Sequence, residues 1–97
     1  MWQPKEIGTV FAQRKLTFRG KQRRGTVTIQ IGCPVRGEDP RDPWWCPIRI
    51  EGAIKGFDAI AGEDSLQALV LALRFLQLTL PAAARRHGGE VDWLGER

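Results

Sequence analysis

An α+β fold is predicted for this chain: an antiparallel meander of about four strands, with one long C-terminal helix packed on one face. Three observations lead to it. Apolar and polar residues alternate strictly in several short segments, glycine and proline separate those segments, and residues 65–80 carry apolar side chains at helical spacing. With 97 residues, 42% of them hydrophobic, we expect a single domain over 1–97, with 1–9 as a loosely packed N-terminal segment.

The first two strands are predicted at 10–19 and 26–33, joined by a basic hairpin turn between Gly20 and Gly25. The second strand alternates most clearly, because β-branched residues occupy every other position and polar residues the positions between. Such alternation indicates one buried face and one solvated face. Pro34 ends this strand, since proline has no N–H to donate to a neighbour.

The third strand is predicted at 44–51, after a long polar turn at 36–43. Pairing it with the second strand about this turn places all the strong apolar residues on one face, and a slip of one residue would undo that. The predicted pairs are Cys33 with Cys46, Ile31 with Ile48, and Ile29 with Ile50. Pro47 within the strand favours a bulge or an edge position.

A tight turn at Gly52-Ala53 is predicted to lead into a short fourth strand, 54–60. This turn would place Phe57 and Ala59 beside Ile48 and Cys46.

The helix is predicted to begin after Gly62 and to end at about Leu80, because Pro81 follows. Asp64 and Gln67 have the spacing of a capping box. One apolar stripe is expected to cover the sheet: Leu66, Leu69, Leu73, Leu76 and Leu80. A second stripe, Ala68, Leu71, Phe75 and Leu78, lies nearly opposite, and Leu71, Phe75 and Leu78 are the predicted homodimer interface. Val91, Trp93 and Leu94 form an apolar tail expected to pack back on the domain.

The net charge of +4 comes from one segment. Residues 14–24 hold six basic residues and no acid, whereas the rest of the chain holds nine basic and eleven acidic residues. A basic segment of this kind is either a solvated hairpin end or a surface that attracts nucleic acid or an acidic protein.

Cys33 and Cys46 are too few for a disulfide framework and lack zinc-ligand spacing. Three interpretations remain: two small buried hydrophobic residues, a cross-strand disulfide, or a reactive thiol. We expect the first, with both thiols reduced in the cell.

No nucleotide-binding, metalloprotease or serine-hydrolase motif occurs, and His87 is the only histidine. We therefore expect no enzymatic activity, no metal and no cofactor. Met1–Gly8 lacks the apolar core of a secretory signal, and Arg74 interrupts the longest apolar run. These features predict a cytoplasmic protein with no membrane span.

The expected function is a non-enzymatic protein-interaction module, with an immunity or antitoxin role as one specific form suggested by analogy. Trp44 and Trp45 point to opposite faces of their strand, so one can anchor the core. The other either anchors a partner or is covered by the long turn or by the tail that carries Trp93. The candidate partner-binding residues lie on the polar face and the first hairpin: Lys15, Arg19, Lys21, Arg23, Arg24, Trp45 and Arg49. The alternative is a nucleic-acid-binding protein that uses the same surface. A small-ligand pocket between tail and sheet is a third hypothesis.

Three strings carry a resemblance to a known family: Trp45–Gly52 (WCPIRIEG), Gly62–Leu69 (GEDSLQAL) and the closing Trp93-Leu94-Gly95. With these strings the chain, from about Phe11 onward, resembles a family of small bacterial proteins described as a domain of unknown function. The resemblance implies a bacterial cytosolic protein and supplies no functional residues. These three strings do not place the Trp2-Gln-Pro-Lys start or the basic first hairpin within the family's pattern.

Overall fold

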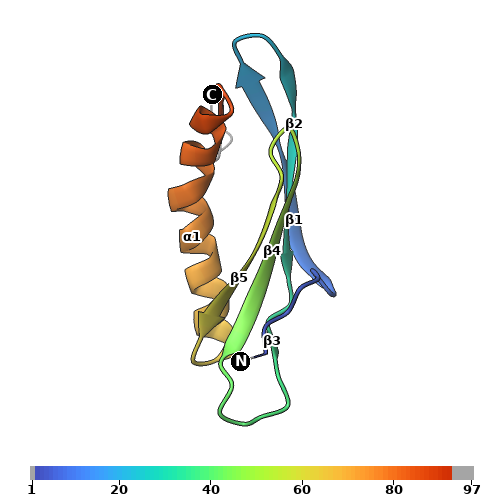
Figure 1. The fold of residues 1–97 in the computed structure, drawn as a ribbon, viewed down its shortest axis with the longest axis vertical. Coiled ribbons are helices and arrows are strands. Elements are labelled where there is room, and N and C mark those ends of the chain that lie inside the picture. The colour runs from blue at the N-terminus through green and yellow to red at the C-terminus, as the bar shows by residue number, and fades with distance from the viewer. Residues whose placement is uncertain (1, 93–97) are drawn as a thin grey trace.

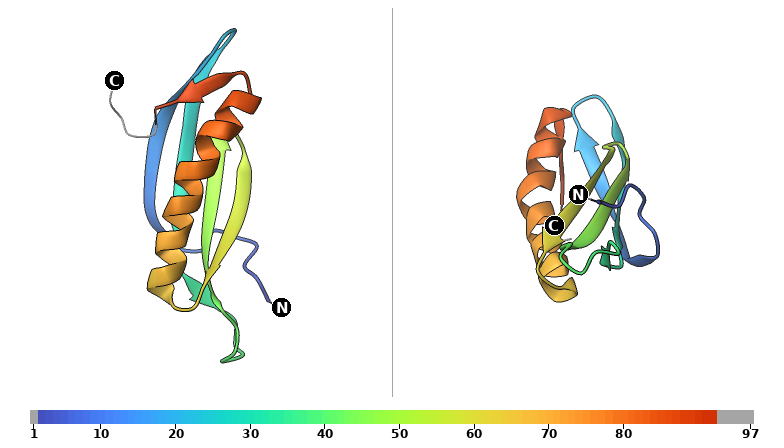
Figure 2. Two further views of the ribbon diagram at one scale, coloured as in Figure 1. Left: turned by 90° about the vertical axis from the view of Figure 1, so that its left-hand side faces the viewer. Right: turned by 60° about the horizontal axis from the view of Figure 1, so that its bottom comes forward.

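The computed structural model describes residues 2–92 and shows a mixed α+β fold, as the sequence predicts: a curled antiparallel sheet with one long helix across one face (Figures 1 and 2). The molecule is elongated, with principal extents of 48 × 22 × 20 Å. In chain order the elements are β1 (Val10–Gly20), β2 (Arg24–Gly32), β3 (Val35–Arg36), β4 (Trp44–Gly52), β5 (Gly56–Gly62), α1 (Ser65–Arg86) and β6 (Gly89–Val91).

The long strands form the predicted meander, because β2 pairs with β1 and β4, and β4 pairs with β5. Two short strands were not predicted. β3 pairs with the start of β4, and β6 pairs with the end of β1 after the chain returns from the helix. We call the sheet face against α1 the inner face and the other the outer face.

The predicted register between the second and third strands is confirmed for two of its three pairs, whereas the third pair, Cys33 with Cys46, lies beyond the end of β2. Ile31 lies opposite Ile48 and Ile29 opposite Ile50, and the side chains of Ile29, Ile31 and Ile48 are buried on the inner face. Only this register places the alternating β-branched residues of both strands on the same side. β1 joins the same face through Leu16 and Phe18, which are also buried.

The predicted register of the fourth strand is wrong by one residue. Phe57 lies opposite Arg49 and Ala59 opposite Pro47, on the outer face instead of beside Ile48 and Cys46. The turn is longer than two residues, since Ala53–Lys55 separate β4 from β5 and Ile54 turns into the core. A shift of one residue exchanges the faces of a whole strand.

The start of α1 is as predicted. Asp64 caps the helix by accepting a hydrogen bond from the backbone N–H of Gln67 at 2.7 Å, and the Gln67 side chain accepts one from the backbone N–H of Glu63 at 2.7 Å. The predicted end at Leu80 is wrong, because α1 continues through Pro81 to Arg86. The three alanines after Pro81 favour helix, and the buried Leu80 and Ala84 hold this last part against the sheet.

The predicted inner stripe of the helix is only half right. The side chains that are buried recur every four residues and are mostly small: Ala68, Ala72, Leu76, Leu80 and Ala84. Leu66 and Leu73, expected to face the sheet, are exposed, whereas Ala68, expected on the opposite stripe, is fully buried. Because both sides of the helix are apolar, hydrophobicity does not select the inner side. Small side chains bring the helix axis close to the sheet.

Candidate functional site

Basic side chains from two elements gather at one end of the molecule. The turn of the β1–β2 hairpin contacts the end of the helix, where the backbone N–H of Lys21 donates to the carbonyl of Gly88 at 3.4 Å. An open hollow between them is lined by Arg19, Lys21 and Arg85 together with Glu90. We call this the basic end; it comprises Arg19, Lys21, Arg23, Arg24, Arg85 and Arg86.

Two of these arginines are engaged within the fold. Arg23 lies over the Phe18 ring, 4.9 Å from its centroid, and donates to the carbonyl of Ala53 at 3.4 Å. Arg19 forms an ion pair with Glu90 at 3.9 Å, and both side chains remain substantially exposed. Arg19 also lies opposite Arg24 across the hairpin, a pairing of like charges that favours an external anion.

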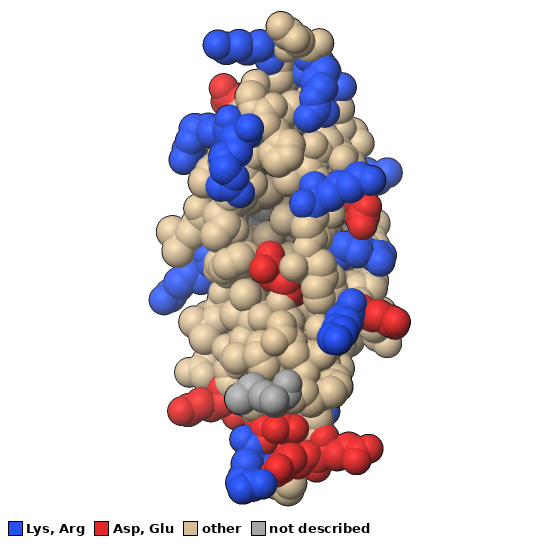
Figure 3. Space-filling view, viewed as in Figure 1, with Lys and Arg blue, Asp and Glu red and all other residues tan. Residues whose placement is uncertain are grey.

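Acidic side chains gather at the other end, around the β3–β4 loop and the start of α1 (Figure 3). We call this the acidic end; it comprises Glu38, Asp39, Asp42, Glu63 and Asp64. Arg41 offsets part of its charge through two hydrogen bonds to the Asp39 carboxylate, at 2.9 and 3.2 Å. This pairing lowers the pKa of Asp39 below its ordinary value. The domain is therefore charged oppositely at its two ends.

The predicted partner-binding residues do not form one site. Lys15, Arg19, Lys21, Arg23 and Arg24 belong to the first hairpin. Trp45 lies near the start of β4, beside β3 and at the other end of the sheet. Arg49 lies between them.

Trp45 is half-buried, with a buried indole N–H that has no hydrogen-bond partner, so it is not the exposed anchor that the sequence suggested. Arg49 is also committed within the sheet. It donates to the side-chain oxygen of Gln30, and Gln30 donates to Gln13 at 3.0 Å. This ladder crosses β4, β2 and β1 on the outer face.

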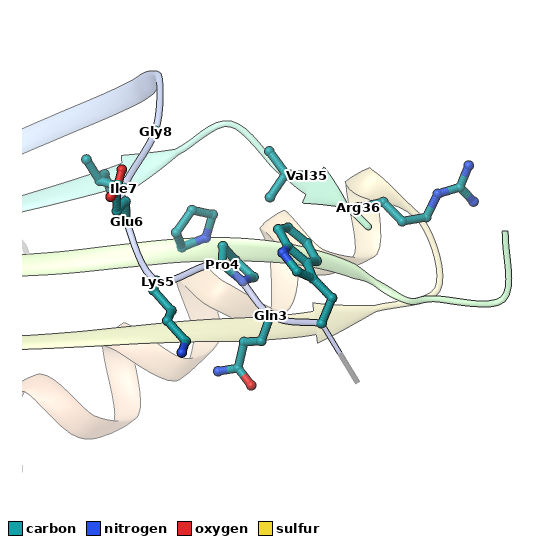
Figure 4. A pocket seen from close by; sticks show the side chains of 10 residues that line it. Gln3, Pro4, Lys5, Glu6, Ile7, Gly8, Val35 and Arg36 are labelled. Carbon is teal, nitrogen blue, oxygen red and sulfur yellow. The ribbon is translucent and has the colours of Figure 1, made fainter. Parts of the chain in front are cut away.

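The alternation in the strands predicts that the outer face is solvated, but part of this face is covered. Residues 2–9 lie against it, with Pro4 buried and Ile7 half-buried. Gly32 permits this contact, because a Cβ there would stand 2.2 Å from the Ile7 carbonyl oxygen. Beside this segment lies an open hollow of about 570 Å³, lined by Gln3–Gly8, Val35, Arg36 and Pro47 among others (Figure 4).

The outward side of α1 is the main exposed apolar surface of the helix. Leu66, Val70 and Leu73 are 68%, 45% and 39% exposed and recur at spacings of four and three residues. Residues at such spacings lie on one side of a helix. We call these three residues the outer ridge. They begin one turn from the acidic end.

The predicted dimer stripe is divided in two. Leu71 and Phe75 are half-buried, and Phe75 packs against the core, so Phe75 contributes to the fold itself. Leu78, 72% exposed, stands apart from the outer ridge on the helix surface. Sequence reasoning missed the outer ridge because it assigned Leu66 and Leu73 to the core.

Both cysteines are free thiols near the same edge of the core. Cys46 is buried, and its thiol donates to the carbonyl of Gly32 at 3.6 Å. Burial, reinforced by the nearby Cys33, raises the pKa of the Cys46 thiol to about 11. A thiol with so high a pKa is protonated at neutral pH and is a poor nucleophile.

Within residues 2–92 no group of three or more histidine, cysteine or acidic side chains is arranged to hold a metal ion. His87 closes the helix, with its Nδ1 2.9 Å from the carbonyl oxygen of Ala83.

By length and composition α1 could cross a membrane, with a mean hydropathy of 1.5 over its most apolar stretch. Core helices of soluble proteins meet the same criterion, and α1 packs on the sheet through its buried side.

Comparison with known proteins gives one match. Residues 12–97 match the family described as "Domain of unknown function (DUF6968)". The chain belongs to this family. No curated protein and no solved structure matches it. The basic end, the acidic end and the outer ridge all lie inside the DUF6968 domain, whereas residues 2–8, which line most of the hollow in Figure 4, precede it. The predicted Trp93 and Leu94 contacts lie outside the described residues.

Proposed function

We propose that this DUF6968 protein is a non-enzymatic interaction module of the bacterial cytoplasm that binds a protein through the outer ridge of α1. The observation that carries the proposal is the exposure of Leu66, Val70 and Leu73 on the side of the helix that faces away from the sheet. Aligned apolar residues on one helix side are the usual anchors when a helix docks into a protein groove.

The energetics favour a partner for this ridge. Burying one aliphatic side chain of this size contributes about 1.5–3 kcal/mol, so three adjacent ones can anchor an interface. The oppositely charged ends of the domain would orient the partner and increase the rate of association. Inhibition of a toxin is one activity within this class, and the basic end disfavours a basic nuclease as its target.

Site-specific photo-crosslinking in living cells tests the proposal. A photoreactive amino acid at Val70 is expected to give an adduct of one defined mass, and the adduct should be lost when Leu66→Glu is added. The matched control carries the same amino acid at Thr17, an exposed position on the outer face of the sheet. Absence of any Val70 adduct, or equal labelling from Thr17, would contradict a binding role for the ridge.

A second candidate function is nucleic-acid binding by the basic end, favoured by the six basic residues that the hairpin and the helix end bring together. The acidic end would repel phosphates if the domain lay lengthwise, so contact would be end-on and limited to few phosphates. Binding of labelled single-stranded and duplex oligonucleotides should then weaken steeply between about 50 and 200 mM salt. No binding at the lower salt concentration would exclude this function.

A further inference from the structure

The outer ridge and the charges along α1 together constrain what can pack there. The ridge is apolar, Glu63 lies in the turn just before the helix, and Arg74 follows Leu73 on the helix. Arg85 and Arg86 follow in the last turn. The helix surface therefore changes from acidic to basic along its length, and an occupant that complements it must change in the opposite direction.

We propose that the occupant is a second copy of this chain, packed with its helix antiparallel so that the two outer ridges meet about a two-fold axis beside Val70. The inference rests on the proposed function, because it names the partner of the same ridge. A two-fold axis makes a surface meet itself, so the surface has to be self-complementary. A helix with acid at one end and base at the other has this property only in the antiparallel arrangement.

The spacing of the residues supports this arrangement. With the axis beside Val70, the Val70 side chains meet, and Leu66 lies beside the partner's Leu73. Arg74 then lies opposite the partner's Leu66, in the first turn of the partner's helix, and Glu63 lies in the turn just before that helix. An arginine side chain is long enough to reach that turn, so we expect two equivalent Glu63–Arg74 ion pairs to flank the apolar centre.

The ends of the helices extend the complementarity. Arg85 and Arg86 reach past the start of the partner's helix, towards the end of the molecule where the acidic β3–β4 loop projects (Figures 1 and 3). In a parallel pair each charged residue would lie beside its own copy. Glu63 would face the partner's Glu63, and Arg74 would face the partner's Arg74. Like charges at these positions oppose parallel packing.

Sedimentation equilibrium of the full chain, over concentrations from about 1 to 500 µM, measures the dimer. An interface centred on three apolar residues is small, so the expected dissociation constant is on the order of micromolar. Val70→Glu should weaken the dimer at least about 100-fold, because it places two carboxylates at the apolar centre. Leu78→Glu is the matched control: it alters an exposed leucine of the same helix outside the ridge and should leave the dissociation constant within about twofold.

A charge reversal tests the orientation. Glu63→Arg and Arg74→Glu should each weaken the dimer about 5- to 20-fold, and the chain that carries both should regain affinity to within about threefold of the original. The two positions are too far apart along one helix to pair with each other, so the recovery reports contact between copies. Circular dichroism and thermal unfolding of each variant check that these exposed substitutions leave the fold intact.

The possible results separate the two proposals. A monomer at 500 µM, a dimer that Leu78→Glu disrupts and Val70→Glu does not, or a double reversal without recovery would each overturn the antiparallel dimer. A Val70 crosslink to a different protein would also overturn it, while supporting the proposed function. A monomer that also gives no crosslink in cells would overturn both.

Discussion

The two sides of α1 differ in side-chain size, and the smaller apolar residues, not the larger ones, are buried against the sheet. The inner side buries three alanines and two leucines, whereas the outward side exposes Leu66, Val70, Leu73 and Leu78. The small inner residues permit close packing of helix on sheet, and the larger apolar residues are left for another surface. In this helix, hydrophobicity marks residues that pack against something, and residue size decides which of them pack against the sheet.

The largest expected effect tests this contrast directly. Leu76→Ala should lower the free energy of unfolding by about 2–5 kcal/mol, because Leu76 is fully buried and its removal leaves a cavity. The matched substitution Leu66→Ala, at a 68% exposed leucine of the same helix, should change it by less than about 0.5 kcal/mol in the monomer. Urea denaturation at low protein concentration measures both. Equal losses would mean that the outward side contributes to the monomer core.

The packing of an element can be predicted from the sequence when that element has a single apolar face. The β2–β4 register follows from the sequence because each strand has one apolar face, so only one alignment satisfies both. The buried side of the helix does not follow from the sequence in the same way, since apolar residues lie on both sides of α1. Only contact with the sheet determines that Ala68 is buried and Leu66 is exposed. The β5 register depended on turn length, which the burial of Ile54 set.

The candidate sites were predictable to different degrees for the same reason. The basic hairpin is one continuous segment, so the sequence alone predicts it. That Arg85 and Arg86 lie beside this hairpin depends on a helix that continues past Pro81. The partial cover of the outer face depends on contacts between residues distant in the chain: residues 2–9 reach this face where Gly32 leaves room. No local pattern reports such contacts.

A second, smaller expected effect concerns a buried residue of the sheet: the Cys46 thiol should make the free energy of unfolding depend on pH. The Cys46 thiol has its pKa raised to about 11 by burial, whereas a thiol in the unfolded chain titrates near 8.5–9. Below about pH 8.5 both states hold the proton, so Cys46 adds no pH dependence. Between about pH 9 and 11 the unfolded chain loses its proton first, and the free energy of unfolding should fall, by on the order of 1–3 kcal/mol.

Urea denaturation at pH 8 and pH 10.5 measures this loss. Cys46→Ala is the control, because it lowers stability at both pH values but removes the thiol's share of the decline between them. Lysine and arginine titration is common to both proteins and cancels in the comparison. If the two proteins decline in parallel, the buried thiol does not titrate abnormally.

The smallest expected effect separates local structure from packing at the start of α1. Asp64→Ala removes the acceptor of the 2.7 Å hydrogen bond from the Gln67 N–H and should lower the free energy of unfolding by about 1 kcal/mol. Glu63→Ala is the matched control: its side chain makes no capping bond, and its backbone N–H still donates to Gln67, so stability should change by a few tenths of a kcal/mol at most. Thermal unfolding of the three proteins at the same low concentration measures the difference. Because Glu63 is placed in the proposed dimer contact and Asp64 in the cap, raising the concentration into the dimer range should narrow the difference between them: Glu63→Ala then loses part of the added stability of association, while Asp64→Ala retains most of it.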